Sequence, residues 1–108
     1  MGENLKLTAL KQKANRLPLT PGVYIMKAKN GVIIYIGKAK SLKNRVTQYF
    51  GAGNQHTEKV RKMVSQVDDF EYVLCDSELE AGILENSLIK PNQPKYNILL
   101  KDDKGYHY

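Results

Sequence analysis

Residues 22–37 read GVYIMKAKNGVIIYIG, and this stretch decides the fold. Gly22–Lys27 and Val32–Ile36 are rich in β-branched and aromatic residues, which predicts two strands. Asn30-Gly31 between them is a strong signal for a two-residue turn that joins antiparallel strands. The sequence therefore predicts a β-hairpin near its N-terminus.

The hairpin register places two tyrosines on one face. A two-residue turn gives the pairs Lys29 with Val32, Met26 with Tyr35, and Tyr24 with Gly37. Because side chains alternate along a strand, Tyr24 and Tyr35 become diagonal neighbours about 7–8 Å apart. Two such tyrosines can pair their phenols in a site, or they can simply pack the sheet. A bulge with an odd number of residues would separate them.

Helix and turn signals surround the hairpin. Leu5, Leu10, Ala14 and Leu17 indicate a short helix, which the prolines at 18 and 21 stop. After the hairpin we expect a helix from Ser41 to about residue 50, a glycine-rich break at 51–54 and a second helix over 57–66. A strand over 70–74 follows. The last helix is opened by the Ser77/Glu80 capping box and closed by Pro91 and Pro94. This order predicts a single α+β domain over 1–108, with a small antiparallel-start, three-stranded sheet flanked by helices.

Charge points to a polyanionic partner. The chain has 17 Lys and Arg against 11 Asp and Glu, a net charge of +6, which favours DNA or RNA first. Without a polybasic tail or a basic amphipathic helix, we expect no membrane partner. The sequence has no long apolar run and no signal-peptide pattern, so we expect a cytoplasmic protein. Its one cysteine, Cys75, is expected to be a small buried residue.

The segment after the second predicted strand is a candidate phosphate-binding loop. It reads GKAKS over 37–41 and leads into a helix, whose exposed N–H groups favour an anion. Lys38, Lys40 and Lys43 are the candidate contacts to DNA phosphates. The glycine spacing of a triphosphate-binding loop is missing, so a nucleoside triphosphate is not the expected ligand.

The helix that follows carries a candidate cation for catalysis. Leu42, Val46 and Tyr49 form its expected buried stripe, and Arg45 lies beside Tyr49 on a neighbouring position. An arginine at the border of the core can stabilise a phosphodiester oxygen with two hydrogen bonds. The competing interpretation is an ordinary arginine at the surface.

Glu85 is a charged residue at a position where the helical pattern predicts an apolar one. Counting about 100° per residue from Leu79, Glu85 falls in one sector with Ala81, Leu84, Leu88 and Ile89. A carboxylate that faces a core is costly unless it is paired or binds a cation. A salt bridge satisfies it, and so does Mg²⁺ or Mn²⁺, which accept one or two carboxylates with water. Asn97, polar in an apolar tail, forms either a turn or a hydrogen bond to a site.

In combination and order these motifs resemble the GIY-YIG nuclease family, and within it the N-terminal domains of the UvrC excision nucleases. The stretches that carry the resemblance are GVYIM at 22–26, YIGKAKSLKNRV at 35–46, LENSLIK at 84–90, PKYN at 94–97 and LKDDKGY at 100–106. Val23 stands where isoleucine is usual, and the residues at 91–93 depart from the common pattern. UvrC is a longer protein, so the resemblance implies that this chain is its N-terminal part.

The resemblance implies a metal-dependent endonuclease that makes the 3′ incision in nucleotide excision repair. It implies that Glu85 holds one Mg²⁺ or Mn²⁺, that Tyr35 acts on the water with Tyr24 as its hydrogen-bonded neighbour, and that Arg45 stabilises the phosphate. Lys38, Arg45 and the metal would then favour the phenolate of Tyr35. Asn97 is implied to help fix the site, and Tyr49 to support Arg45. The implied partners are damaged double-stranded DNA and UvrB, with UvrA upstream.

Three other functions compete with this hypothesis. They are a stand-alone endonuclease for branched or foreign DNA, a DNA-binding module without catalysis, and a domain that only assembles partners. All expected catalytic positions are occupied, which favours an enzyme. We expect the domain alone to bind DNA weakly and to cut little, because few phosphate contacts give a salt-sensitive affinity. No role is assigned to His56.

Overall fold

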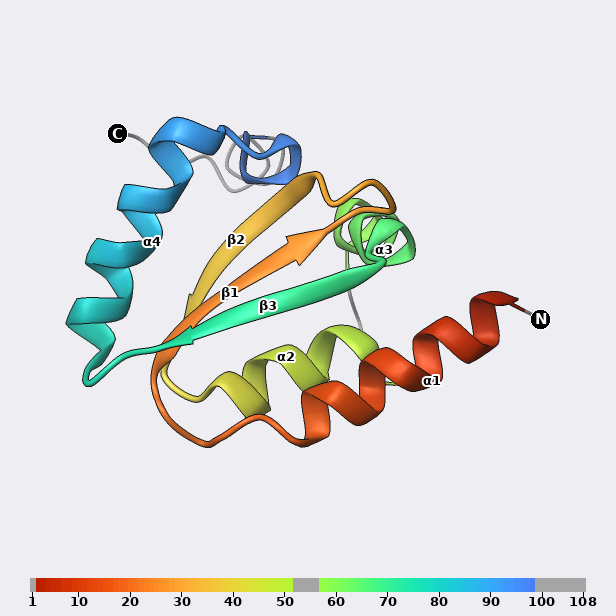
Figure 1. The fold of residues 1–108 in the computed structure, drawn as a ribbon, viewed down its shortest axis with the longest axis horizontal. Coiled ribbons are helices and arrows are strands. Elements are labelled where there is room, and N and C mark those ends of the chain that lie inside the picture. The colour runs from red at the N-terminus through yellow and green to blue at the C-terminus, as the bar shows by residue number, and fades with distance from the viewer. Residues whose placement is uncertain (1, 52–56, 99–108) are drawn as a thin grey trace.

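The computed structural model describes residues 2–51 and 57–98 (Figure 1). Its elements in order are α1 (Gly2–Asn15), β1 (Gly22–Lys27), β2 (Ile33–Ala39), α2 (Leu42–Phe50), α3 (Glu58–Gln66), β3 (Asp69–Leu74) and α4 (Glu78–Asn92). The predicted order is confirmed. The second strand was placed wrongly at 32–36, because pairing with β1 continues to Ala39. Three parts of the sequence analysis lie outside the described residues: positions 52–54 of the glycine-rich break, His56, and the motif at 100–106.

The sheet has the strand order β2-β1-β3, and both pairs are antiparallel. Helix α4 packs on one face against β2 and β1, while α2 packs on the other face and α1 packs against α2 (Figure 1). The predicted α+β domain with a three-stranded sheet between helices is confirmed. Strand β2 is an edge strand, so part of its backbone is free to bind other groups. No helix among the described residues is long and apolar enough to span a membrane.

The hairpin loop is one residue longer than expected. The Ala28 N–H donates to the Val32 carbonyl at 2.8 Å, so the loop is 29–31 and the predicted pairing of Lys29 with Val32 is wrong. Gly31 has φ 78°, the left-handed conformation that ends such loops. A bulge between Met26 and Lys27 then restores the predicted pairs. The odd loop and the odd bulge cancel, and the tyrosine register survives.

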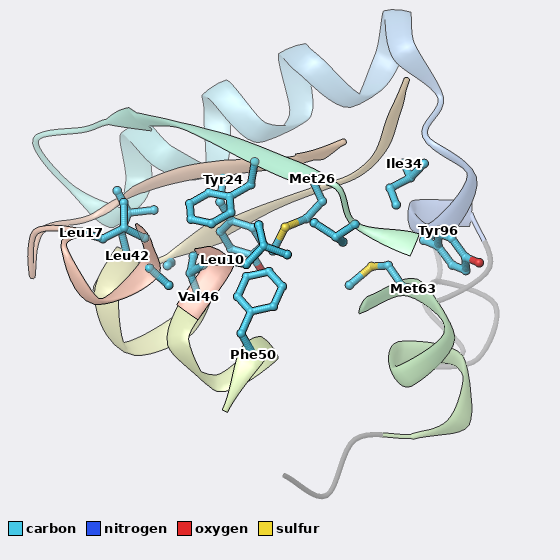
Figure 2. Packing of buried hydrophobic residues seen from close by; sticks show 14 residues of the cluster. Leu10, Leu17, Tyr24, Met26, Ile34, Leu42, Val46, Phe50, Met63 and Tyr96 are labelled. Atoms are coloured by element: carbon cyan, nitrogen blue, oxygen red, sulfur yellow. The ribbon is translucent and has the colours of Figure 1, made fainter. Parts of the chain in front are cut away.

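The sheet separates two hydrophobic clusters. Tyr24 and Met26 of β1 pack with residues from α1, α2 and α3, which Figure 2 shows gathered beneath the sheet. The next residues of the strand, Val23 and Ile25, face α4 instead. This alternation on a strand with both faces covered explains why the sequence of β1 is continuously apolar.

Two helix faces differ in detail from prediction. Leu10 and Ala14 of α1 and Leu17, just after the helix, are buried as expected, but Leu5 is 74% exposed. In α2 the buried residues are Leu42, Val46 and Phe50, so Phe50 takes the core position expected for Tyr49. Its ring stacks on Phe70 of β3 at a centroid distance of 5.9 Å. Tyr49 is half-buried and is left to face the hairpin tyrosines.

The last helix begins as the sequence predicts and ends slightly later. The Ser77 hydroxyl accepts a hydrogen bond from the Glu80 N–H, and the Glu80 carboxylate accepts one from the Asp76 N–H. This is the expected capping box, except that the Glu80 carboxylate binds the N–H of Asp76, the residue before Ser77, and not that of Ser77 itself. Pro91 lies inside the last turn, and the helix ends at Asn92 before Gln93 turns left-handed with φ 42°. Cys75, just before this helix, is buried as expected.

Candidate active site

Three tyrosines from three elements meet on the face of the sheet that α2 covers. The ring centroids of Tyr24 and Tyr35 lie 6.1 Å apart, which confirms their predicted common face. Tyr49 joins them from α2, because its hydroxyl lies 2.8 Å from the Tyr24 hydroxyl in a hydrogen bond. The helix therefore supplies a third phenol to the pair that the hairpin register predicts. Tyr49 is expected to support Arg45 from the neighbouring turn of α2, and in the structure its hydroxyl also bonds to Tyr24.

Gly37 creates the space for the Tyr24 ring. A Cβ built on Gly37 would lie 2.4 Å from Cζ and Oη of Tyr24, closer than any side chain allows. Gly37 is also the first residue of the candidate phosphate-binding loop at 37–41. In the structure it lets a tyrosine approach, because Tyr24 and Gly37 are direct partners across β1 and β2.

Burial dominates the acidity of these phenols. The pKa of Tyr24 is raised well above its ordinary value, first by burial and then by Tyr49 and Tyr35, while Arg45 lowers it. The pKa of Tyr35 is also raised, first by burial, then by Tyr49 and by the negative charge of Glu85. We expected positive charge to favour the phenolate. Arg45 acts in that direction, but the chain's own groups keep both phenols protonated at neutral pH.

Opposite charges approach the phenols from two different helices. Arg45 of α2 is exposed, and its charge acts on Tyr24. Glu85 of α4 is half-buried, and its charge acts on Tyr35. Tyr35 belongs to the edge strand β2, and α2 and α4 lie on opposite faces of the sheet, so the two charges flank the phenols from both faces at this strand. The site therefore lies at a sheet edge between two helices.

The apolar sector that contains Glu85 is narrower than predicted. Ala81 is fully buried, and Leu84, Leu88 and Ile89 pack against the cluster beneath α4. Leu79, from which the sector was counted, is 75% exposed. Glu85 itself is half-buried, so it lies at the border of this core and not in its centre.

Asn97 contacts the backbone of β2. Its Oδ1 accepts a hydrogen bond from the Ile36 N–H and its Nδ2 donates to the Ile36 carbonyl, both at 2.8 Å. The side chain thus binds both polar groups that Ile36 presents at the free edge of the sheet. The Asn97 side chain thus bonds to the backbone of β2, while its own backbone N–H closes a turn onto the Pro94 carbonyl. It fixes the segment between Tyr35 and Gly37, and through it the position of both tyrosines.

Two residues without an expected functional role hold Asn97 in place. Tyr96 is 1% exposed, and its hydroxyl donates to Oε1 of Gln66 at the end of α3, at 3.0 Å. The Asn97 N–H donates to the Pro94 carbonyl. The turn that carries Asn97 is therefore anchored to α3 and the core. A buried aromatic residue directly before a polar one was the only available signal.

The predicted phosphate contacts come from three separate parts of the chain. Lys38 is exposed on β2 and its Nζ lies over α4, 3.5 Å from the position of a Cβ on Gly82. Lys40 is exposed in the connection to α2, and Lys43 is half-buried on α2 itself. The Ser41 hydroxyl caps α2 by accepting from the Asn44 N–H, as expected. These lysines therefore extend from the side of α4, which the Lys38 ammonium approaches, to α2, which carries Lys43.

Three ion pairs lie away from this edge. They join Lys6 to Asp68, Lys13 to Asp69, and Lys27 to Glu71, all around β3. The acidic residues of β3 are thus neutralised locally. Lys38, Lys40 and Arg45 form none of these ion pairs, so positive charge remains available beside the site.

The donor set at the edge fits one hard divalent cation. Glu85 supplies a half-buried carboxylate, and the described residues contain no group of three His, Cys, Asp or Glu side chains that could hold a metal. A zinc site needs three or four protein ligands. Mg²⁺ keeps most of its water and binds through one or two carboxylates, so a single glutamate is sufficient.

Comparison with known proteins identifies the family. The family model described as the UvrC-like GIY-YIG domain matches residues 20–98, which includes the hairpin, both helices of the site and Asn97. The chain belongs to the UvrC-like GIY-YIG domain family.

Curated members of the family are closely similar in sequence. The UvrABC system protein C of Clostridium tetani is 63% identical over 92 residues, which cover 85% of this chain and 15% of that protein. The UvrABC system protein C of Clostridium botulinum is 58% identical over 99 residues, 92% of this chain and 16% of that protein. The GIY-YIG chain therefore spans about one-sixth of the length of these relatives.

Solved structures confirm the fold. The GIY-YIG N-terminal endonuclease domain of UvrC from Thermotoga maritima, bound to its catalytic divalent cation magnesium, matches with a TM-score of 0.73 and 46% identity. The match covers 82% of this chain and 94% of that one. A second structure of that domain carries an asparagine-to-alanine substitution and matches with the same TM-score.

Proposed function

We propose that this chain is a metal-dependent endonuclease domain that hydrolyses one phosphodiester bond of DNA. One observation carries the proposal: Glu85 and Arg45 approach a cluster of phenols from two helices at a single sheet edge. A phosphodiester hydrolase needs a cation site, a group that orients water and a positive charge near the phosphate. Glu85, Tyr35 and Arg45 are the candidates for these three roles. The magnesium in the Thermotoga maritima domain supports the same assignment.

Glu85 is the residue that would hold the cation, as Mg²⁺ or Mn²⁺. When bound, the cation polarises the phosphate and stabilises the leaving oxygen. The half-buried position of Glu85 limits water around the carboxylate and so strengthens its attraction for a cation.

Tyr35 is the residue that would orient the attacking water. With its pKa raised by burial, Tyr49 and Glu85, it is a hydrogen-bonding phenol at neutral pH and not a phenolate. Tyr24 and Tyr49, joined at 2.8 Å, fix the neighbouring phenols. A proton can leave Tyr35 only when positive charge beside it outweighs these influences.

Arg45 is exposed at the border of the cluster, where its guanidinium can reach a phosphate oxygen with two hydrogen bonds. Lys38, Lys40 and Lys43 would hold neighbouring phosphates from both sides of the edge. Asn97 would act by fixing the backbone at Ile36.

The substrate and partners are proposed from the family. The relatives are UvrABC system proteins about six times as long as this chain, so we propose that the chain is the N-terminal part of such a protein. Its substrate is then damaged double-stranded DNA in the cytoplasm, its cut is the incision 3′ to the lesion, and its partner is UvrB, with UvrA acting earlier. The domain alone should bind DNA weakly.

The test is a Glu85→Gln substitution in the full-length protein, assayed with UvrA, UvrB and a duplex that carries one defined lesion. We expect loss of the 3′ incision by at least about 100-fold, because the amide retains the size but loses the charge that holds the cation. Glu58→Gln, an exposed glutamate on α3, is the matched control and should cut normally. A normal 3′ incision rate in Glu85→Gln would refute the proposal.

A further inference from the structure

A groove of about 400 Å³ lies beside the site, on the part of α4 that the sheet does not cover. Its walls are formed by Lys38 of β2 and by Glu78, Leu79, Gly82, Ile83 and Asn86 of α4. Lys38 is proposed above as a phosphate contact, whereas the wall that α4 contributes has no role in the proposed function.

The groove has an apolar wall that is open to solvent. Leu79 is 75% exposed and Ile83 is 62% exposed, and residues four apart are neighbours on one face of a helix. Since α4 uses other residues to pack on β1 and β2, these two side chains do not contribute to the cores. Their position suits contact with an apolar surface of a ligand.

One end of the groove carries an unpaired cation. The Nζ of Lys38 lies over Gly82, which has no side chain to push it away. Within residues 2–51 and 57–98, Lys38 takes part in no ion pair. An ammonium group in this position can bind a phosphate.

The groove is directly adjacent to Glu85. Asn86 is the next residue of α4, and Gly82 lies less than one helical turn before Glu85, a rise of about 5 Å along the axis. A DNA strand whose phosphate is cut at Glu85 must place its neighbouring nucleotides close by. The groove is where one of them can lie.

We propose that this groove binds the nucleotide next to the cut phosphate, with its phosphate on Lys38 and its base against Leu79 and Ile83. The proposal rests on the proposed nuclease function and adds a subsite to it. An aliphatic wall contacts the flat face of a base only when that base has left the stack, so the bound nucleotide is unpaired. This favours DNA that is already opened near the cut.

Glu78 adds a preference among the bases. Its carboxylate would repel a phosphate, but it accepts hydrogen bonds, as an acid does from the amino group of cytosine. Adenine, cytosine and guanine carry such an amino group, whereas thymine does not. We therefore expect thymine to be the weakest ligand of the groove.

The experiment measures binding of this 108-residue chain to a short duplex with an unpaired flap, in which 2-aminopurine replaces one nucleotide at a time. Leu79→Ser with Ile83→Ser should weaken binding roughly three- to tenfold, at or below the low end of the loss that removal of an aromatic stacking residue causes, because an aliphatic wall has no π face. The control is Leu19→Ser with Val32→Ser, two equally exposed apolar residues elsewhere, which should bind normally. At one position, the 2-aminopurine fluorescence should rise on binding, because the base leaves the stack, and this rise should depend on Leu79 and Ile83.

An abasic nucleotide at that position provides the decisive comparison. It should weaken binding of the wild type by the same factor and cause no further loss in the double variant. Equal losses for normal and abasic DNA would overturn the proposal. So would normal DNA binding combined with loss of UvrB binding, since the groove would then be a protein-docking surface. Because this assay needs no cleavage, it gives an answer even if the Glu85→Gln experiment fails.

Discussion

Replacement of Asn97 by alanine removes the link between the C-terminal turn and the edge of the sheet. The side chain makes two hydrogen bonds of 2.8 Å to Ile36, and alanine makes neither. Each such bond contributes about 0.5–1.5 kcal/mol net, and water replaces part of the loss at a sheet edge. We therefore expect the free energy of unfolding to fall by about 1–3 kcal/mol.

The effect on catalysis should be larger than the effect on stability suggests. Ile36 lies between Tyr35 and Gly37, so its movement displaces the phenol and the surface against which Tyr24 packs. A misplacement of about 1 Å in a catalytic group can cost on the order of 100-fold in rate. We expect kcat to fall by about 10- to 100-fold while the KM for DNA stays nearly unchanged.

Urea unfolding followed by circular dichroism measures the stability, and single-turnover cleavage by the full-length protein measures the rate at a temperature where the variant is folded. With a urea dependence of about 1–3 kcal/mol per molar, the midpoint should fall by about 1 M. Asn44→Ala on the surface of α2 is the control, because only its backbone forms a hydrogen bond. A wild-type cleavage rate in Asn97→Ala would refute the positioning role of the two hydrogen bonds to Ile36, whatever the stability of the variant.

Three further predictions follow from individual contacts. Gly37→Ala should abolish cleavage and destabilise the fold, because its Cβ would overlap the Tyr24 ring. Gly31→Ala places its Cβ in open space, so it should lower the free energy of unfolding by only about 1 kcal/mol, for the positive φ of this residue. Unfolding and cleavage measurements on both variants check this. Tyr96→Phe should lower kcat several-fold by releasing the turn from Gln66, and a wild-type rate would show that this hydrogen bond has no positioning role. Burial alone raises the pKa of Asp69, but bonds from Lys13 and the Phe70 N–H and the charges of Lys13 and Lys27 hold it below its usual value. Such a carboxyl stabilises the fold above its unfolded-state pKa of about 4, and this stability is lost as the pH falls through the lower folded-state pKa. Asp69→Asn should therefore be less stable at pH 7 and show a flatter loss of stability below about pH 4, measured by urea unfolding against pH.

The sequence was sufficient for features that depend on local patterns. Alternation along β1 and β2 predicts that Tyr24 and Tyr35 share a face, and this depends only on an even offset between the strands. The capping residues Ser41 and Ser77 mark where α2 and α4 begin, because their hydroxyls bind N–H groups within the next turn.

Other features depend on tertiary packing that no local pattern encodes. Asn30-Gly31 is compatible with a loop of two or three residues, and the compensating bulge is not visible in the sequence. Helical periodicity predicts which side of α4 carries Leu79, but it does not predict whether another element covers that side chain. The partner of Asn97 is the backbone of Ile36, 61 positions away, and a backbone group leaves no mark in the sequence.

The central claim is that Glu85 holds a divalent cation beside the phenols. The most direct measurement is an anomalous difference map from crystals of this chain soaked in Mn²⁺. The account predicts one peak within about 2.0–2.2 Å of a Glu85 carboxylate oxygen, with its remaining ligands mostly water, and no peak in Glu85→Gln crystals. A Mn²⁺ peak bound elsewhere, with none at Glu85, would contradict it.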